Sequence, residues 1–355
     1  MSDVARVMVY GASGHTGQLV VRDLIARGYA PLLAGRNRES LERVAASMGR
    51  SLPMSVVALD NTAALYSALE NTDVLVNCAG PLNETSFVLA SAAIDQEVHY
   101  FDTNAVEQIA AKRLFDDLHG AARRSGVAIV PGMATFGGLG DLIASHSLRG
   151  IGQIISVTIS YLVKGWIPTR GSQATAAGVQ GAPRLIFNDG SFSVGCEPAR
   201  LGRFDFGSPF GVIDVVENYP GVDVATVPRH VPAKHVAVQM ALSTLQEFRS
   251  LEPEHAAQVD GRIRKNTEFV VVVDTHYHGG HRRTVAQGKD IYGFTATILG
   301  NAVDRVTHGP GMSGVLSPSQ LFDPAEFLEA LMGQGLRLHG EELSSAAGLA
   351  ELSAA

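Results

Sequence analysis

The sequence predicts an α/β protein in which a doubly wound parallel sheet is joined to a second, α+β domain with a mainly antiparallel sheet. Two observations lead to this fold class. Over the first third of the chain, short apolar runs alternate with amphipathic stretches at helical spacing, as in parallel sheets covered by helices. After Pro131, glycine and proline become dense and the apolar runs lengthen and partly alternate, which favours antiparallel strands.

The elements of the first part follow one another at short intervals. We expect strands at residues 7–10, 32–34, 54–59, 74–77, 98–101 and 127–130, and helices at 15–27, 39–48, 61–70, 85–94 and 105–124. Right-handed crossovers would bring the carboxyl ends of these strands to one edge of the sheet, where ligands bind in such folds.

The second part has fewer and less regular elements. A strand is expected at 154–163, and two more at 269–277 and 283–287 flank Gly279–Gly280, a pattern typical of a hairpin. A helix is expected at 291–306. Another at 323–332 has Asp323 as its N-cap and Pro324 at its first position.

Composition excludes several classes of protein. The chain has 355 residues and a net charge of −7, which argues against nucleic acid as the main partner. Its two cysteines, Cys78 and Cys196, are too few for a disulfide framework or a cysteine zinc site. No signal-peptide pattern and no long apolar run is present, so we expect no membrane span and a cytoplasmic location.

A glycine-rich turn, Gly11-Ala-Ser-Gly14-His-Thr-Gly17, follows the first strand and opens a helix. In that context it predicts a Rossmann-type dinucleotide site. The first glycine permits the tight turn, the second lets the backbone approach the pyrophosphate, and the third lets helix and strand pack closely. Free N–H groups at the helix start then face the phosphates. The predicted contacts in this turn are Gly11, Ser13, Gly14, His15, Thr16 and Gly17.

The end of the second strand selects the cofactor. An NAD site places an acidic residue there to bind the ribose 2′-hydroxyl, whereas this chain has Arg36 followed by Asn37. Arginine accommodates a 2′-phosphate and can stack on adenine. We therefore predict NADP(H), with Arg36 and Asn37 among its contacts.

The loops after the third and fourth strands add further candidate contacts. Asp60 is expected near the adenine, and Asn77, Cys78, Ala79, Gly80 and Pro81 are expected beside the nicotinamide half of the cofactor. Cys78 has no neighbour in the sequence that would lower its pKa, so we interpret it as a small buried thiol rather than a nucleophile.

Other patterns narrow the chemistry. No tyrosine has a lysine four residues later, so the Tyr-x-x-x-Lys pair of short-chain dehydrogenases is missing, and the context of Cys196 does not favour a thioester-forming enzyme. His276, His278 and His281 surround the hairpin turn, but no matching segment supplies a carboxylate. We interpret them as an exposed hairpin tip and predict no metal site.

Several segments along the chain share their residues with one known family. They are the turn at 11–17, the Ala34-Gly35-Arg36 strand end, 77–81, His99-Tyr100-Phe101-Asp102, Pro131-Gly132 with 137–142, Gly288-Lys289-Asp290-Ile291-Tyr292 and Gly314-Val315-Leu316-Ser317-Pro318. Through these segments the sequence resembles the saccharopine dehydrogenase-like oxidoreductases. After Asp102 the family usually continues to Gly-Glu, whereas Thr103 and Asn104 follow here. The resemblance adds Asp102 to the predicted cofactor contacts.

The resemblance also implies a domain arrangement and an oligomeric state. It implies a dinucleotide-binding domain at 1–131 that is completed by about 310–343, and an inserted substrate and dimerisation domain at 132–309. It also implies homodimers. Residues 344–355 are rich in small side chains, so we expect a frayed tail there.

The same resemblance suggests hydride transfer from NADPH to an imine C=N bond or a conjugated C=C bond of a small or carrier-bound metabolite. The predicted catalytic residues are Lys164, His235 and Tyr100, and Arg170 is predicted to pair with a substrate carboxylate or phosphate. The alternative is a non-catalytic NADP(H)-binding protein that reports redox state.

Overall fold

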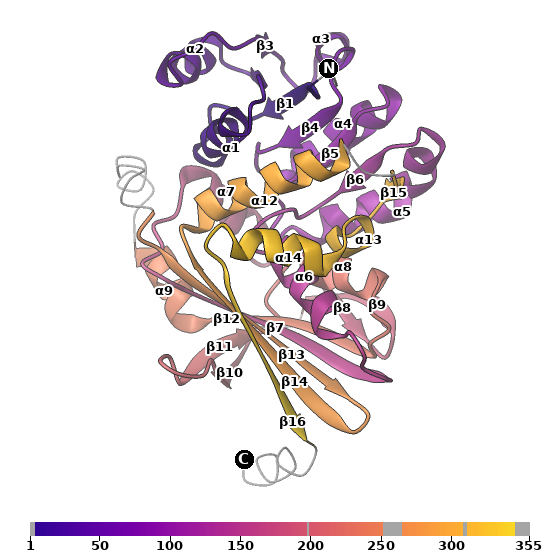
Figure 1. Cartoon of the computed structure of the whole chain (residues 1–355), viewed down its shortest axis with the longest axis vertical. Helices are drawn as coiled ribbons and strands as arrows, with labels where there is room; N and C mark the ends of the chain where they lie inside the picture. Colours follow the sequence, from indigo (N-terminus) through magenta and orange to yellow (C-terminus); the bar gives the residue numbers. More distant parts are fainter. Residues whose placement is uncertain (1–3, 197–198, 251–264, 308–310, 345–355) are drawn as a thin grey trace.

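The computed structural model describes residues 4–196, 199–250, 265–307 and 311–344 (Figure 1). Two sheets lie in separate layers, and helices from the second half of the chain lie between them (Figure 1). The α/β class predicted from the sequence, with one parallel and one mainly antiparallel sheet, is confirmed.

The first sheet has seven parallel strands in the order β15-β6-β5-β4-β1-β2-β3. Its strands are β1 (Val7–Tyr10), β2 (Leu32–Gly35), β3 (Met54–Val56), β4 (Val74–Asn77), β5 (His99–Asp102), β6 (Ala128–Val130) and β15 (Gly314–Val315). The crossover helices are α1 (His15–Ala26), α2 (Arg38–Ser47), α3 (Thr62–Leu69), α4 (Leu82–Asp95) and α5 (Gln108–Arg124). The strand order reverses direction between β1 and β4, which opens a crevice at their carboxyl ends.

The second sheet has nine strands, and β12 and β7 are its parallel pair. They are β7 (Ile154–Lys164), β8 (Arg184–Asn188), β9 (Ser191–Gly195), β10 (Arg200–Asp205), β11 (Val212–Glu217), β12 (His235–Ala241), β13 (Glu268–Tyr277), β14 (Gly280–Lys289) and β16 (Arg337–Ser344). The helical elements of this half are α6 (Gly138–Ser147), α7 (Arg170–Val179), α8 (Asp223–Thr226), the 3-10 helix η1 (Val227–Arg229), α9 (Leu242–Ser250), α12 (Ile291–Val306), α13 (Pro318–Leu321) and α14 (Pro324–Met332).

The predicted hairpin is present as β13 and β14, and Asp323 caps α14 through its side chain. Helix α5 begins at Gln108 rather than 105, because the Asn104 side chain bonds both the N–H and the carbonyl of Glu107 and forms a separate turn. Strand β3 ends at Val56, so Asp60 lies in the following turn. Helices α7 and α9 and strand β16 were not predicted.

The segment predicted to complete the first domain, 310–343, divides between the two sheets. Strand β15 pairs with β6 in the first sheet, whereas β16 pairs with β14 in the second. The domain limits themselves remain a prediction. The predicted tail lies outside the described residues apart from Ser344.

Helices α1 and α12 form a parallel pair that joins the start of the chain to its last quarter. His15 contacts Tyr292 edge-on at one end, and Arg27 binds Asp304 at the other, at the same sequence separation of 277 residues. Gly300 lies between these contacts, where a Cβ atom would meet Asp23 Oδ2 at 1.9 Å. Its missing side chain therefore lets the two helices approach closely.

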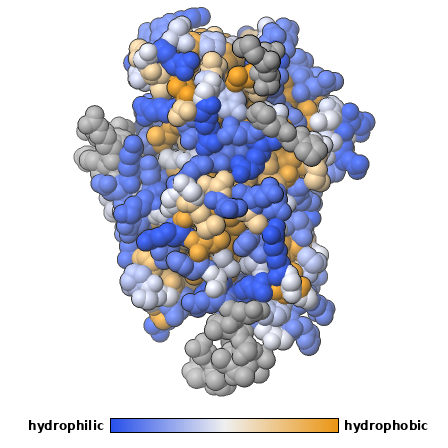
Figure 2. All heavy atoms as spheres, viewed as in Figure 1, coloured by the Kyte–Doolittle hydropathy of each residue, from blue (hydrophilic) through white to orange (hydrophobic). Residues whose placement is uncertain are grey.

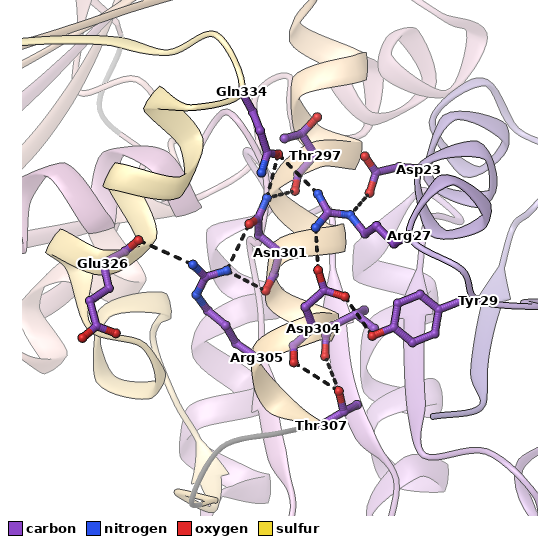
Figure 3. A network of polar contacts seen from close by, with 11 residues as sticks. Asp23, Arg27, Tyr29, Thr297, Asn301, Asp304, Arg305, Thr307, Glu326 and Gln334 are labelled. Atoms are coloured by element: carbon purple, nitrogen blue, oxygen red, sulfur yellow. Dashed lines mark hydrogen bonds and ion pairs between the residues drawn. The ribbon is translucent and has the colours of Figure 1, made fainter. Parts of the chain in front are cut away.

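A polar network secures the far end of this pair (Figure 3). Arg27 bonds Asp23 Oδ2 at 2.5 Å and Asp304 Oδ2 at 2.6 Å, and Tyr29 donates to Asp304 Oδ1 at 2.8 Å. Gln334, just beyond α14, accepts from Arg27 and from Asn301. The network ties α1, α12 and the end of α14 together, and thereby fixes where the first turns of α1 and α12 meet.

One buried apolar cluster reaches from the first sheet to the second. It contains Val7 and Val9 of β1, Leu142 of α6, Val271 of β13 and Leu299 of α12. On the face shown in Figure 2, apolar patches interrupt a mainly polar surface. None of the described helices is long and apolar enough to cross a membrane.

Candidate functional site

The glycine turn between β1 and α1 has the backbone that its sequence predicts. Gly11 has a φ of +79°, and a Cβ atom there would lie 2.8 Å from the amide nitrogen of Ala79. A Cβ atom on Gly17 would lie 2.2 Å from the carbonyl oxygen of Gly11. The turn therefore accepts no side chain at either position. The amides of Gly11, Ala12 and Gly14 bond backbone carbonyls and hold the turn in shape. The N–H groups at the start of α1 are then the donors available to a pyrophosphate.

The end of β2 presents an arginine beside this turn. Arg36 is exposed and makes no ion pair within the described ranges, while Asn37 caps α2 by accepting from the Ser40 amide. Burial raises the pKa of Tyr10, and Arg36 acts to lower it while Asp60 acts to raise it, so all three are neighbours. The guanidinium is therefore free to bind a 2′-phosphate at this edge of the sheet.

Asn77, the last residue of β4, fixes the loop that follows this strand. Its amide nitrogen donates to Thr85 Oγ1 at 3.0 Å and to the Tyr100 hydroxyl at 3.1 Å, while its oxygen accepts from the Ala79 amide. Cys78 is half-buried and lines the cavity described below, so the prediction of a buried thiol is wrong. Desolvation raises its pKa to about 12, which still argues against a nucleophile. The chain then passes through a cis Gly80–Pro81 bond into α4.

Tyr100 and Asp102 are fully buried in β5. The Tyr100 hydroxyl donates to Asp102 Oδ2 at 3.0 Å, and Asp102 Oδ1 accepts from the Gly132 and Asn104 amides. Burial raises the pKa of Asp102 to about 6 and that of Tyr100 well above its usual value. This network positions the loops that follow β5 and β6, and neither side chain reaches the cavity described below.

Lys164 and His235 lie outside that cavity as well. Lys164 is exposed at the end of β7, with its Nζ 4.6 Å from the centroid of the Phe210 ring. His235 begins β12 and bonds Asn188 through Nδ1. The structure therefore does not bring Lys164, His235 and Tyr100 together, and their catalytic roles stay predictions.

A cavity of about 1560 Å³ lies along the edge where the first sheet faces the second. Its lining runs from Ser13, Gly14, His15 and Thr16, past Cys78 and Gly80, to residues of α7, α9 and α12. Five cationic side chains and one carboxylate take part in that lining: Arg22, Arg170, Arg184, Arg249, Lys265 and Glu107. In a chain with a net charge of −7, this excess of positive charge favours anionic ligands.

Tyr292 lies in the wall between the glycine turn and α7. Its hydroxyl oxygen accepts from the indole N–H of Trp166 at 3.0 Å and from the Thr169 amide at 3.2 Å. Ser172 Oγ lies 3.0 Å away, and Thr169 Oγ1 lies 3.0 Å beyond that. Because both lone pairs of the phenol oxygen are occupied, its own proton is directed to Ser172.

Sequence reasoning did not predict Tyr292 or Glu107 as site residues. Tyr292 was visible as part of the Gly-x-Asp-x-Tyr segment, and Glu107 was placed inside a predicted helix. Arg170 was predicted to contact substrate, and it lies at the start of α7 in the cavity lining.

The hairpin histidines do not form a cluster with the site. The rings of His276 and His281 stack with centroids 4.3 Å apart, and His281 Nε2 lies 3.1 Å from Asp274 Oδ1. Among the residues that the structure describes, no group of three or more His, Cys, Asp or Glu side chains is arranged to hold a metal ion.

The fold and the glycine turn define a Rossmann-type nucleotide-binding protein. Residues 7–130 match the family described as the saccharopine dehydrogenase NADP binding domain. The resemblance predicted from the sequence is confirmed, and so is NADP(H) as the cofactor.

Two individual proteins are also similar to this chain. A saccharopine dehydrogenase-like oxidoreductase from Bos taurus is 28% identical over 141 residues, which are 35% of this chain and 33% of that protein. The matched part thus spans about a third of the curated relative. The structure of apo saccharopine dehydrogenase (L-Glu forming) from Saccharomyces cerevisiae matches 96% of this chain and 100% of its own, with a TM-score of 0.62 at 14% identity. That likeness concerns the fold.

Proposed function

We propose that this chain is an NADPH-dependent oxidoreductase that transfers a hydride to the C=N bond of an imine or to a conjugated C=C bond. The observation that carries the proposal is the cavity of about 1560 Å³ that begins at the glycine turn and extends to α7 and Tyr292. Ligand pockets commonly measure about 300–1,000 Å³. This one therefore has room for a small or carrier-bound substrate beside the cofactor end.

The glycine turn fits the cofactor, because a Cβ atom on Gly11 or Gly17 would clash with neighbouring backbone and open the tight turn. The N–H groups at the start of α1 would bind the pyrophosphate, and Arg36 would bind the 2′-phosphate. Bound NADPH would supply the hydride. Arg170, which makes no ion pair within the described part of the chain, would then orient an anionic group of the substrate.

The proton would come from Tyr292, with the substrate replacing Ser172 as the acceptor of its hydroxyl hydrogen. Tyr292 lines the cavity, and the N–H groups of Trp166 and Thr169 already point at the oxygen that becomes charged when the proton leaves. Ser172 and Thr169 continue the hydrogen-bonded chain and would return a proton to the phenol. This placement favours Tyr292 over Lys164, His235 and Tyr100, which lie outside the cavity lining.

Cofactor selection is tested first, by titrating the wild type, Arg36→Glu and Arg43→Glu with NADPH and NADH. We expect the wild type to prefer NADPH, and Arg36→Glu to lose that preference by about 100-fold because its carboxylate repels the 2′-phosphate. Arg43 is exposed further along α2 and serves as the matched control, which should keep the preference. Tighter binding of NADH by the wild type would overturn the cofactor assignment.

Turnover is tested by NADPH oxidation with cyclic imines and with enoyl thioesters. Tyr292→Phe should lower kcat by about 100-fold or more and change the Kd of NADPH by less than about threefold. Tyr66→Phe, on α3 outside the cavity lining, is the control and should leave kcat unchanged. A fully active Tyr292→Phe variant would exclude Tyr292 as the proton donor. Absence of hydride transfer to every compound, with NADPH bound, would favour a redox-reporting role instead.

The proposal also includes the oligomeric state and the location of the protein. We propose that it is a homodimer in the cytoplasm, and sedimentation of the purified protein would test the homodimer. A monomer with full NADPH affinity would leave the cofactor assignment intact and remove the dimer.

A further inference from the structure

Glu107 occupies the loop between β5 and α5, where its backbone and one carboxylate oxygen are tightly held. Asn104 bonds the backbone N–H and carbonyl of Glu107, at 2.9 and 3.0 Å. Oε1 accepts from the amides of Leu82 at 2.6 Å and Asn83 at 3.2 Å, in the first turn of α4. The side chain therefore spans from the end of β5 to the loop that follows β4.

The other oxygen of this carboxylate has no such partner. Glu107 is 5% exposed, and its Oε2 is buried without a hydrogen bond among the described residues. A buried acceptor without a partner lowers stability. Oε1 alone is enough to cap α4, so capping does not explain why a second, unpaired oxygen is buried here. Burial also raises the pKa of Glu107 to about 7, against the opposing effect of the Asn83 and Leu82 amides.

Glu107 borders the part of the cavity where the nicotinamide is expected. Cys78 and Gly80 of the β4 loop and Thr103 of the β5 loop line the same cavity. These loops follow neighbouring strands at the carboxyl edge of the sheet, on the nicotinamide side of the point where the strand order reverses. Glu107 thus lies in the cavity wall at the edge where the carboxamide end of the cofactor is expected.

We propose that Glu107 Oε2 accepts a hydrogen bond from the carboxamide N–H₂ of bound NADP(H). The carboxamide has two N–H donors, and an acceptor without a partner satisfies one of them. Glu107 would then recognise the nicotinamide end of the cofactor, as Arg36 is proposed to recognise the adenosine end. The inference rests on NADP(H) as the cofactor and not on the identity of the substrate.

The test compares NADPH with its acetylpyridine analogue, in which a methyl ketone replaces the carboxamide and no N–H remains. Calorimetric titration should show that the wild type binds NADPH about tenfold or more tightly than the analogue. In Glu107→Gln, the amide oxygen can still accept from the α4 amides while the NH₂ group faces the carboxamide. We expect the ratio of the two affinities to fall close to one.

Glu84→Gln is the matched control, because it removes an exposed carboxylate from the same turn of α4 without touching the cavity. It should retain the wild-type ratio. If Glu107→Gln keeps the wild-type ratio of the affinities for NADPH and the analogue, the proposal is overturned. A ratio near one in the wild type would overturn it as well, without any variant. Failure of the wild type to bind NADPH at all would count against the cofactor assignment itself.

Discussion

Asp223, at the first position of α8, is a fully buried carboxyl group. Tyr161 donates to its Oδ1 at 2.7 Å, and its Oδ2 has no hydrogen-bond partner among the described residues. Burial raises the pKa of Asp223 to about 7, although the bond from Tyr161 acts to lower it. Between about pH 4 and pH 7, Asp223 is therefore protonated in the folded protein and ionised in the unfolded chain.

This difference gives Asp223→Asn a pH-dependent effect on stability. As pH rises through that window, ionisation favours the unfolded wild type, whereas the amide cannot ionise. We expect the unfolding free energy of the variant to gain about 1–3 kcal/mol relative to wild type between about pH 4 and about pH 8, as measured by urea unfolding. Asp214→Asn, exposed on β11, should show no such trend. A pH-independent difference for Asp223→Asn would contradict the expectation.

At the scale of helices, the close packing of α12 against α1 requires a glycine at position 300. A Cβ atom on Gly300 would lie 1.9 Å from Oδ2 of Asp23 on α1 and 2.3 Å from Nε of Arg27, the C-cap of α1. Arg27 pairs with Asp304 and so holds α1 against α12, and Asp23 pairs with Arg27 in turn (Figure 3). An added methyl group would displace them, and the contact between His15 and Tyr292 at the other end of the pair would loosen with it.

Gly300→Ala should therefore destabilise the protein, although alanine favours helices by about 1 kcal/mol over glycine. We expect a net loss of about 0.5–2 kcal/mol in unfolding free energy, because overpacking costs about 1–3 kcal/mol. Gly178→Ala in α7 is the matched control, since no atom lies near its Cβ position, and it should be neutral or stabilising. Thermal denaturation of both variants measures the contrast. Equal stability of the two would refute the close approach.

Across the whole molecule, the predictable parts are those whose determinants are local. The glycine turn, the Arg36 strand end and the β13–β14 hairpin each depend on a few neighbouring residues, and the structure contains all three. Tyr292 and Glu107 depend on contacts with distant segments. Tyr292 accepts a hydrogen bond from Trp166, which lies 126 residues away in the sequence. Glu107 accepts one from Leu82, which follows a neighbouring strand of the sheet.

The same reason explains the errors in the elements. The helical spacing of apolar residues predicts helix at 105–107 as well, but the Asn104 side chain takes over the hydrogen bonds of that turn and leaves Glu107 in the cavity wall. Helix α7 buries none of its own side chains. Its sequence therefore carries no apolar stripe from which a helix could be predicted.

The pairing of α1 with α12 also bears on how the chain is made. The ribosome releases residue 27 long before residue 304, and at about 5–20 residues per second the first helix waits roughly 15–55 s for its partner. Strand β15, which lies against β6, emerges later still. The nascent cofactor-binding segment thus exposes an apolar helix face and an open sheet edge until residues 291–315 have been synthesised.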